Sequence, residues 1–427
     1  MRVFQFGGAM FSLRQFGRSG WRARGGNGRG ATTAGLTGGL GRAVFALLMV
    51  LAVPACIPGG GTATGPGTVI DDTAIASGET LGTGSVRVAL LLSRSATGNA
   101  GSTAMAYRNA AELAIKDFPG ADVQLVVYDT GGTPESAQTA ANRAVSEGAE
   151  LILGPLFSSE VRSVAPIARR AGVPVVAFSS DRTTAGSGVY LLSFLPANNI
   201  TAIVDFAASR GQRAYAAILP NDGYGAVVEA AFRQRVAAAG GQVVAVERYQ
   251  LDQIDIQAKA AKIAEQGDRF DTLLIPGTGQ EVPLITGILS TSGLSGKKIM
   301  YLGSGQWDDR RIYNNQALAG AFYPAPDRRS FDAFAQRYKA AYNADPPRRA
   351  SLAYDGVVLA AGLVRQFGAE RFSQKVLTNP NGFAGIDGVF RFLVNGTNQR
   401  QLTIYEVTGS GTRVEKPAPR SFPGSGT

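Results

Sequence analysis

The sequence predicts an α/β protein made of two doubly wound parallel-sheet lobes. The chain has 427 residues, 45% of them hydrophobic, which is enough to bury two cores. Short apolar runs such as Val86–Leu92 alternate with longer segments of helical periodicity, and this alternation indicates β-α-β units. The alternation starts again after Leu195, so it predicts two halves of similar construction.

The first half is expected to contain strands where apolar runs occur and helices where apolar residues form a stripe. Thr133 is a predicted helix N-cap, Pro134 suits the first helical position, and Gly148 suits the end of that helix. The expected elements are strand Val86–Leu92, helix Ser102–Phe118, strand Val123–Tyr128, helix Pro134–Glu147, strand Leu151–Gly154, helix Glu160–Arg170, strand Val173–Phe178 and strand Val189–Leu195.

The second half repeats the pattern and ends in strands. The segment 388–408 is expected to be one β-hairpin, because Asn395-Gly396 is a strong two-residue turn signal. The other expected elements are helix Ile200–Ser209, strand Ala214–Leu219, helix Gly225–Ala239, strand Val243–Arg248, helix Ile256–Gln266, strand Thr272–Pro276, helix Val282–Thr291, strand Ile299–Leu302, strand Gly320–Tyr323, helix Ser330–Asn343 and helix Tyr354–Phe367.

The N-terminal segment looks like a bacterial lipoprotein signal. An apolar run of 13 residues, Ala43–Ala55, follows Arg42 and ends at Cys56, the only cysteine of the chain. The run is too short to span a bilayer, which takes about 20 residues. We therefore expect residues 1–55 to be a signal peptide and Cys56 to carry lipid; a structural cysteine and a short apolar anchor remain alternatives. Because Ile57, and not Asp, follows the cysteine, we expect anchoring to the outer membrane.

Charge and composition restrict the possible partners. The net charge of +10 arises mostly upstream of Cys56, where seven of the 42 basic residues and none of the 32 acidic residues lie. The remainder is nearly balanced, and basic pairs such as Arg348-Arg349 are interpreted as solvated positions, so no nucleic-acid partner is expected. Residues 56–84 and 417–427 are rich in Gly, Thr, Pro and Ser and are predicted to be a flexible tether and a disordered tail.

Enzymatic chemistry is not expected. The chain contains no histidine, which excludes Ser-His-Asp and Cys-His catalysis and histidine zinc sites. Ser295–Lys298 fits an S-x-x-K pattern, but no S-D-N or K-T-G motif follows it. The sequence therefore predicts no catalytic residue, no metal site and no cofactor.

Candidate ligand-binding residues follow the strands, because ligands of parallel sheets bind at the carboxyl ends of strands. The loops there are small, hydroxylated and rich in glycine, which suits a polar ligand. Capping and turn formation are the alternative roles for each serine and threonine, and lobe packing is the alternative for Trp307. The candidates are Thr97, Ser158, Ser159, Ser179, Ser180, Tyr224, Thr278 and Trp307.

Four segments in order resemble type I periplasmic binding proteins of the leucine-binding group: Val86–Leu92, Gly154–Ser159, Gly172–Ser180 and Asn221–Gly225. The resemblance covers about residues 85–410 and implies two lobes with the ligand between them and three crossings. It places the crossings near Leu195–Asn198, Ala317–Pro324 and Gly388–Phe392. The first lobe would then comprise 85–196 and 318–387, and the second lobe 197–317 and 388–416.

The resemblance also implies a function. Ser158, Ser159, Ser179 and Ser180 would hold the carboxylate and amine of an amino acid or another small polar ligand, and Tyr224 would cover it. The ligand would be bound in the periplasm for ABC-type transport or sensing, with an ABC transporter permease as partner. The loops Gly154–Ser159, Phe178–Asp181 and Gly303–Asp309 look closer to a lipoprotein branch that resembles activators of penicillin-binding proteins. The alternative is therefore an activator that docks a peptidoglycan synthase and regulates cell-wall synthesis.

Overall fold

The structure, a computed structural model, describes residues 78–292, 294 and 298–422. The predicted signal peptide, the lipidation residue Cys56, the tether up to residue 77 and the last five residues of the tail lie outside the described residues. Among the helices of the described residues, none combines the length and apolar character needed to cross a membrane.

The first lobe is built on a six-stranded sheet with the order β1-β3-β2-β4-β5-β6. All neighbours are parallel except β1, which runs antiparallel to β3. The strands are β1 (Glu79–Leu81), β2 (Val86–Leu92), β3 (Val123–Asp129), β4 (Leu151–Leu153), β5 (Val175–Ala177) and β6 (Val189–Leu191). The main helices are α1 (Asn99–Asp117), α2 (Pro134–Ser146), α3 (Ser158–Ala171), α9 (Arg328–Tyr342) and α10 (Ser351–Phe367).

Helices cover both faces of this sheet, as predicted. Val88 and Leu90 of β2 pack in the same core as α1, α9 and α10, whereas Ala89 and Leu91 pack in the core of α2 and α3. Successive residues of a strand point to opposite faces, so a strand buried on both sides must be apolar throughout. This is why Val88–Leu92, the fully buried part of the strand, is apolar throughout. The predicted cap also forms, since the Thr133 hydroxyl accepts a hydrogen bond from the Ser136 amide at 3.2 Å.

The second lobe is built on a seven-stranded sheet with the order β16-β15-β11-β10-β9-β7-β8. Helices α4 and α5 pack on one face, and α6 and α7 on the other. The strands are β7 (Ala214–Pro220), β8 (Gln242–Tyr249), β9 (Thr272–Leu274), β10 (Met300–Leu302), β11 (Phe322–Ala325), β15 (Thr403–Val407) and β16 (Thr412–Lys416). The helices are α4 (Pro196–Ser209), α5 (Gly223–Ala238), α6 (Gln253–Ala264), α7 (Glu281–Thr291) and the short α8 (Arg310–Tyr313).

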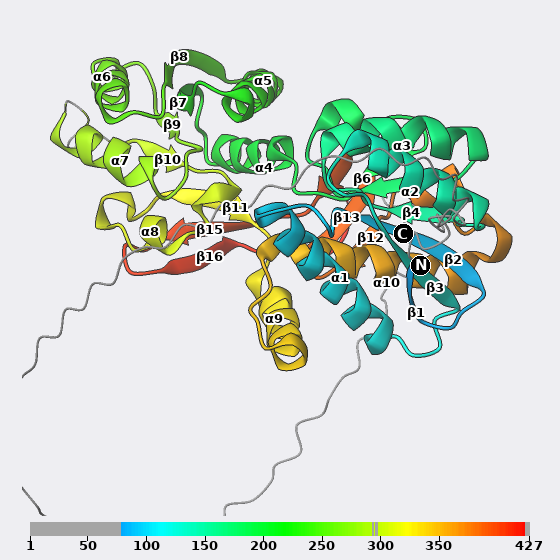
Figure 1. The fold of residues 1–427 in the computed structure, drawn as a ribbon. Helices are drawn as coiled ribbons and strands as arrows, with labels where there is room; N and C mark the ends of the chain where they lie inside the picture. The colour runs from blue at the N-terminus through cyan, green and yellow to red at the C-terminus, as the bar shows by residue number, and fades with distance from the viewer. Residues whose placement is uncertain (1–77, 293, 295–297, 423–427) are drawn as a thin grey trace, which may run out of the picture. The chain divides into compact units, whose positions relative to one another are not determined.

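The chain passes between the lobes three times, through residues 192–195, 326–327 and 401–402. Figure 1 shows the consequence: the first lobe combines blue and cyan segments with orange ones, and the second combines green and yellow segments with the red β15 and β16. The first crossing lies close to its predicted place. The other two lie further along the chain than the boundaries 318 and 388 that the sequence suggested.

Strand pairing explains both shifts. Strand β11 was expected in the first lobe, but it pairs with β10 and β15 and so stays in the second. Strands β13 (Gly388–Phe392) and β14 (Asn398–Arg400) form a small sheet with β12 (Phe383–Gly385), and Phe390 and Phe392 pack in the core of the first lobe. The expected hairpin 388–408 is therefore two units, with a crossing after β14.

The turn between β13 and β14 is also longer than predicted. Gly396 donates to the carbonyl of Leu393 at 2.8 Å and takes a φ of +81°, while Asn395 accepts from the amide of Thr397. A two-residue turn of the expected type would need positive φ at both central residues. A Cβ on Gly396 would lie 2.1 Å from the carbonyl oxygen of Val189, so only glycine fits where the turn packs on β6.

Both predicted flexible ends enter the fold in part. Strand β1 lies inside the expected tether, and its Glu79 forms ion pairs with Arg94 and Arg108. At the other end, Phe422 is buried, and the guanidinium of Arg391 lies 4.2 Å from its ring centre. The boundaries 84 and 417 therefore exclude residues that pack on the first lobe, because composition alone does not reveal single anchoring side chains.

Candidate functional site

The structure places the candidate residues in three settings. Thr97, Ser158 and Ser159 line a hollow of about 610 Å³ on the first lobe, beside the loops that follow β2, β3 and β4. Ser180 and Tyr224 line a second cavity of about 540 Å³ between the lobes. The remaining three candidates line neither. We call the two spaces the first-lobe hollow and the interlobe cavity.

The first-lobe hollow is lined mostly by small residues, and a network of buried polar side chains lies beneath it. Ser158 and Ser159 begin α3, where the first backbone N–H groups have no intrahelical acceptor. Beneath them, Glu160 accepts hydrogen bonds from the hydroxyls of Ser93 at 2.9 Å and Thr130 at 2.6 Å. Burial raises the pKa of the Glu160 carboxyl above its usual value, although these two hydroxyls act in the opposite direction. The network joins the ends of β2 and β3 to the start of α3 and so sets the shape of the hollow.

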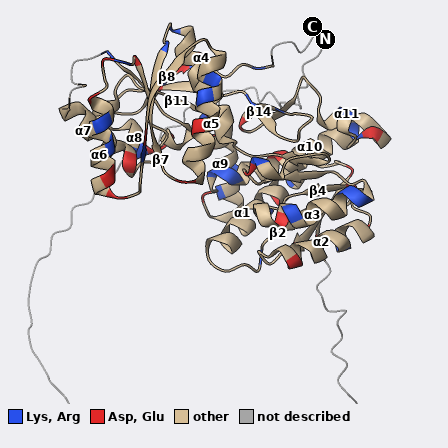
Figure 2. Cartoon of the chain, turned by 90° about the horizontal axis from the view of Figure 1, so that it is seen from above, with Lys and Arg blue, Asp and Glu red and all other residues tan. Residues whose placement is uncertain are grey.

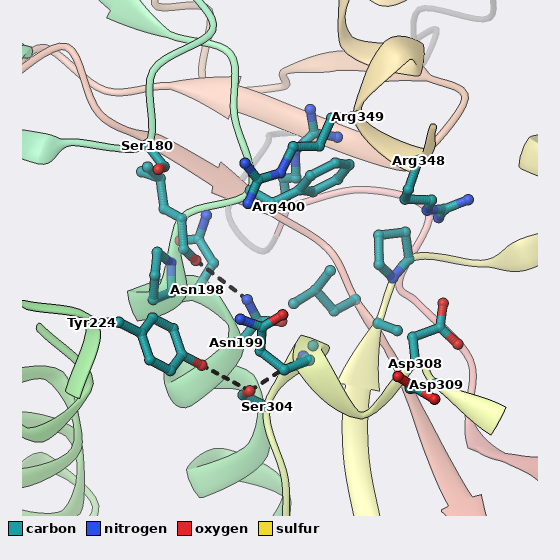
Figure 3. Close-up of a pocket in the computed structure, with 18 residues that line it drawn as sticks. Ser180, Asn198, Asn199, Tyr224, Ser304, Asp308, Asp309, Arg348, Arg349 and Arg400 are labelled. Carbon is teal, nitrogen blue, oxygen red and sulfur yellow. Dashed lines mark hydrogen bonds between the residues drawn. The ribbon is translucent and has the colours of Figure 1, made fainter. Parts of the chain in front are cut away.

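The interlobe cavity is bounded by both lobes and by all three crossings. The first lobe contributes Ser180 and three arginines, and the second lobe contributes mostly amide, hydroxyl and acidic side chains (Figure 3). The residues that line it are Ser180, Phe194, Leu195, Pro196, Asn198, Asn199, Tyr224, Ser304, Gly305, Gln306, Asp308, Asp309, Ala325, Pro326, Arg348, Arg349, Arg400 and Leu402. Any rotation of one lobe against the other would change this space, because the crossings form part of its wall.

Tyr224 is held firmly at the wall of the interlobe cavity. Its hydroxyl lies 2.9 Å from the hydroxyl of Ser304 and 3.2 Å from the carbonyl oxygen of Pro276, as Figure 3 shows for the first of these contacts. Burial raises the pKa of Tyr224 to about 12, so the phenol is neutral at physiological pH. The carboxylate of Asp222 caps α5 by accepting from the amide of Gly225 at 2.7 Å. The ring, not the hydroxyl, is thus the part free to contact a ligand.

Ser179, Thr278 and Trp307 take structural roles. Ser179 is buried and its hydroxyl accepts from the amide of Asp181 at 3.2 Å. Thr278 donates to the carboxylate of Glu281 at 2.5 Å and so fixes the entry to α7. Trp307 has no exposed surface, and its indole N–H donates to the carbonyl of Ile275 at 2.8 Å. Of the two roles left open for Trp307, the structure favours packing within the second lobe.

The three arginines of the interlobe cavity were missed as site residues. Arg348-Arg349 was interpreted as a solvated pair, but Arg348 is half-buried and forms a 2.6 Å ion pair with the fully buried Asp387. Arg400 lies on β14 and is only 6% exposed. Strand β14 reads Asn398-Gln399-Arg400 and has no apolar alternation, so the sequence gives no signal that Arg400 is buried at a cavity. Outside this cavity, Figure 2 shows basic and acidic positions interspersed along the helices of both lobes.

No group of three or more Asp, Glu or Cys side chains within residues 78–292, 294 and 298–422 is arranged to hold a metal ion.

Curated amino-acid-binding proteins are similar in sequence. Leu/Ile/Val-binding protein homolog 6 of Brucella abortus (strain 2308) is 29% identical over 154 residues, which cover 35% of this chain and 40% of that protein. The match thus spans well under half the length of the Brucella protein. The leucine-, isoleucine-, valine-, threonine-, and alanine-binding protein of Pseudomonas aeruginosa PAO1 is 24% identical over 316 residues, covering 69% of this chain and 82% of that protein.

Solved structures share the fold at low identity. A branched-chain amino acid ABC transporter periplasmic ligand-binding protein from Burkholderia xenovorans LB400 has a TM-score of 0.62 at 18% identity, covering 79% of this chain and 95% of that one. The C-domain of LpoA from Haemophilus influenzae, a regulator of PBP1A, has a TM-score of 0.61 at 15% identity, covering 77% and 99%. These similarities confirm the predicted two-lobed α/β fold.

A family model described as "Periplasmic binding protein" matches residues 85–412, which is well over half of the chain. The match extends through both lobes and all three crossings, so it includes every residue that lines the interlobe cavity. The chain therefore belongs to the periplasmic binding protein family, in its leucine-binding-like type I group, as its ordered loops predicted.

Proposed function

We propose that this chain is a non-enzymatic, extracytoplasmic binding lipoprotein that holds a small polar ligand, such as an amino acid, in the interlobe cavity for ABC-type transport or sensing. The observation that carries the proposal is the cavity itself. Its volume of about 540 Å³ is within the range of small-molecule sites, and its lining is rich in polar and charged side chains that suit a polar ligand. A ligand there would contact both lobes at once.

The contact with both lobes links binding to a movement. A ligand that touches Ser180 of the first lobe and Tyr224 of the second gains its full contacts only at one separation of the lobes. Such a ligand favours that arrangement by the difference between its affinities for the two states. A partner such as an ABC transporter permease could then recognise the loaded protein by the arrangement of its lobes.

Relatives support the amino-acid class of ligand. The Pseudomonas relative is named for five amino acids, and the Burkholderia structure is described as a branched-chain amino acid ABC transporter protein. Their names supply a starting panel for this chain, whose own ligand remains part of the proposal.

A thermal-shift assay with the natural amino acids tests the proposal. A ligand that binds only the folded state raises stability by about 2.7 kcal/mol at a concentration one hundred times its Kd. We expect at least one amino acid to raise the Tm and calorimetry to give one site per chain. If no amino acid shifts the Tm, the transport or sensing role in this form is wrong.

Membrane attachment through Cys56 forms part of the proposal. Two or more acyl chains anchor a protein stably where a single chain does not. We expect the wild type to fractionate with outer membranes and Cys56→Ala to be released into the periplasm with an unchanged Tm. A Cys56→Ala protein that is processed but still fractionates with membranes would contradict the lipid anchor.

A second candidate function is regulation of cell-wall synthesis by docking a peptidoglycan synthase. The observation that favours it is the similarity of the whole described fold to the C-domain of LpoA, at a TM-score close to that of the transport protein. A pull-down assay with the purified chain tests this function. If the chain binds a peptidoglycan synthase and no amino acid raises its Tm, this proposal replaces the first one.

A further inference from the structure

The interlobe cavity contains a buried arginine whose hydrogen-bond donors are unused. Arg400 is 6% exposed and lines the cavity, and its three guanidinium nitrogens have no hydrogen-bond partner within the described structure. A guanidinium carries five N–H donors, and leaving buried polar groups unpaired costs about 1–3 kcal/mol, and more for a charged group. An arginine in this state is an exception among buried polar groups and requires an explanation.

The aromatic neighbours of Arg400 do not supply that explanation. Its guanidinium carbon lies 4.9 Å from the ring centre of Phe194 and 5.0 Å from that of Phe390. These contacts stabilise the positive charge through the ring quadrupoles. They provide no acceptor for the N–H groups, which lie in the guanidinium plane. The rings therefore hold the arginine in place while its donors remain unpaired.

The nearby carboxylates of Asp355 and Asp387 do not form an ion pair with Arg400. Asp387 forms its 2.6 Å ion pair with Arg348 and accepts from the hydroxyl of Ser351 at 2.5 Å. Burial, and after it the charge of Asp387, raises the pKa of Asp355 well above its usual range, which weakens Asp355 as a counterion. No carboxylate oxygen of the described residues lies within ion-pair distance of Arg400.

The rest of the cavity wall does not balance this charge. Arg349 is an exposed second cation on the same wall, and the described residues provide no ion pair for it. Across the cavity, Asp308 pairs with Arg328 and Asp309 pairs with Arg311 at 2.6 Å. Figure 3 shows Arg349 and Arg400 next to each other, apart from these two aspartates. The arginine end of the cavity is thus cationic, with an exposed Arg349 and a buried Arg400.

We propose that the interlobe cavity takes a ligand with an anionic oxygen group beyond the α-carboxylate of a neutral amino acid, either a second carboxylate or a phosphate, and that Arg349 and Arg400 bind this group. The proposal deepens the proposed function and rests on it, because it names the chemistry of the ligand for the same cavity. The planar fork of arginine matches carboxylate and phosphate oxygens in pairs of parallel hydrogen bonds. The group would occupy the unused donors of Arg400 and neutralise the end of the cavity that has no counterion.

Calorimetric titration with matched compounds tests the proposal. L-glutamate and succinate carry an extra carboxylate, inorganic phosphate represents phosphate groups, and L-leucine and L-lysine lack an extra anionic group. We expect at least one of the first three compounds to bind more tightly than leucine and lysine. The compound that binds most tightly shows whether the anionic group is a carboxylate or a phosphate. Binding should weaken at about 1 M salt, where the Debye length falls to about 3 Å.

Variants locate the binding group. We expect Arg349→Gln to weaken binding of the anion at least about tenfold, which corresponds to about 1.4 kcal/mol. Arg365→Gln is the matched control, because Arg365 is an exposed arginine of α10 that does not line the cavity. Arg400→Gln and Arg400→Lys should both weaken binding more than Arg349→Gln. Circular dichroism and Tm establish that each variant is folded; if the Arg400 variants do not fold, Arg349→Gln decides alone.

The outcomes separate the two proposals. Tight binding of leucine, unaffected by Arg349→Gln, would overturn the anionic ligand while leaving the proposed function intact. An anion that binds equally well to wild type and Arg349→Gln would also overturn it. If neither anionic nor neutral amino acids bind, both proposals are wrong. An anion that binds only the wild type and the Arg365→Gln control is the result that supports the inference.

Discussion

The two cavities of this molecule differ in how they are built. The first-lobe hollow consists of loops that follow successive strands of one sheet, and Thr97, Ser158 and Ser159 lie on segments of one lobe. The interlobe cavity is assembled where three crossings meet, and it draws residues from positions as far apart as Ser180 and Leu402. The first has small hydroxyl groups; the second has aromatic, amide and guanidinium groups.

The different linings of the two cavities indicate which of them selects among ligands. Hydroxyls and backbone N–H groups bind many polar ligands, whereas a buried guanidinium without a counterion distinguishes ligands by charge. The first-lobe hollow is therefore suited to general polar contacts, and the interlobe cavity to selection. Four predictions can break or sharpen this contrast, beginning with the largest expected effect.

The largest effect on stability is expected at Gly225, which follows Tyr224 and packs closely against the backbone of Pro220. A Cβ added to Gly225 would lie 1.8 Å from the carbonyl oxygen of Pro220, so the start of α5 would have to shift. We expect Gly225→Ala to lower the free energy of unfolding by about 1–3 kcal/mol. Urea denaturation measures it. Gly223→Ala, with nothing within 4 Å of the added Cβ, is the control, and equal stabilities would refute the constraint.

The next effect concerns the ring of Tyr224. We expect Tyr224→Ala to weaken ligand binding at least about tenfold, or about 1.4 kcal/mol, because the ring lines the interlobe cavity. Tyr224→Phe should have less effect on affinity, since the hydroxyl is already bonded to Ser304 and Pro276. Calorimetry with the ligand found in the panel measures both. Unchanged affinity of Tyr224→Ala would assign the ring to packing.

A substitution of Thr278 tests whether its hydroxyl has a structural role or contacts the ligand. Its hydroxyl bonds to the carboxylate of Glu281 and accepts from the amide of Gln280 at 3.2 Å. We expect Thr278→Ala to reduce stability by about 1 kcal/mol and to leave ligand affinity unchanged. Denaturation and calorimetry on the same protein check both halves. A loss of affinity without a loss of stability would restore Thr278 as a binding residue.

The smallest effect is a pH dependence beneath the first-lobe hollow. The raised pKa of Glu160 favours its protonated form in the fold, so its contribution is full below the unfolded pKa and is lost as pH rises through the folded pKa. We therefore expect Glu160→Gln to gain stability relative to wild type over the pH interval that begins at the unfolded pKa of about 4.3 and extends upward. Unfolding free energies measured across this interval check the sign.

Glu112 provides a control of opposite sign. Burial alone would raise the pKa of Glu112, but its hydrogen bonds to Lys116, Tyr342 and Arg108 outweigh burial and lower it. Its contribution is present above the unfolded pKa and is lost as pH falls through the folded pKa. Glu112→Gln should therefore lose stability relative to wild type as pH rises. The same sign for both variants would contradict the assigned environments.

Local pattern predicted much of the fold. Strand β2, the Thr133 cap and the alternation of elements depend on neighbouring residues, and each formed as expected. The crossings after β11 and β14 depend on which sheet a strand joins, which sequence periodicity does not report. The short strand β1 was missed because three residues give no period.

The candidate site was predictable only in part, for the same reason. Ser158 and Tyr224 follow strands and reach cavities, as the strand-end rule predicts. Trp307 follows a strand too, but Gly303 leaves room for the indole, which turns into the core. Arg400 could not be identified from sequence. It stands out because its guanidinium nitrogens are buried in the fold without hydrogen-bond partners, and neighbouring residues in the sequence do not reveal this.

A crystal structure of the protein with L-glutamate, or with the tightest-binding compound of the panel, tests the central claim most directly. The account predicts ligand density in the interlobe cavity, with an anionic group at hydrogen-bonding distance from Arg349 and Arg400 and with the Tyr224 ring against the ligand. Density confined to the first-lobe hollow, beside Thr97 and Ser158, would contradict it.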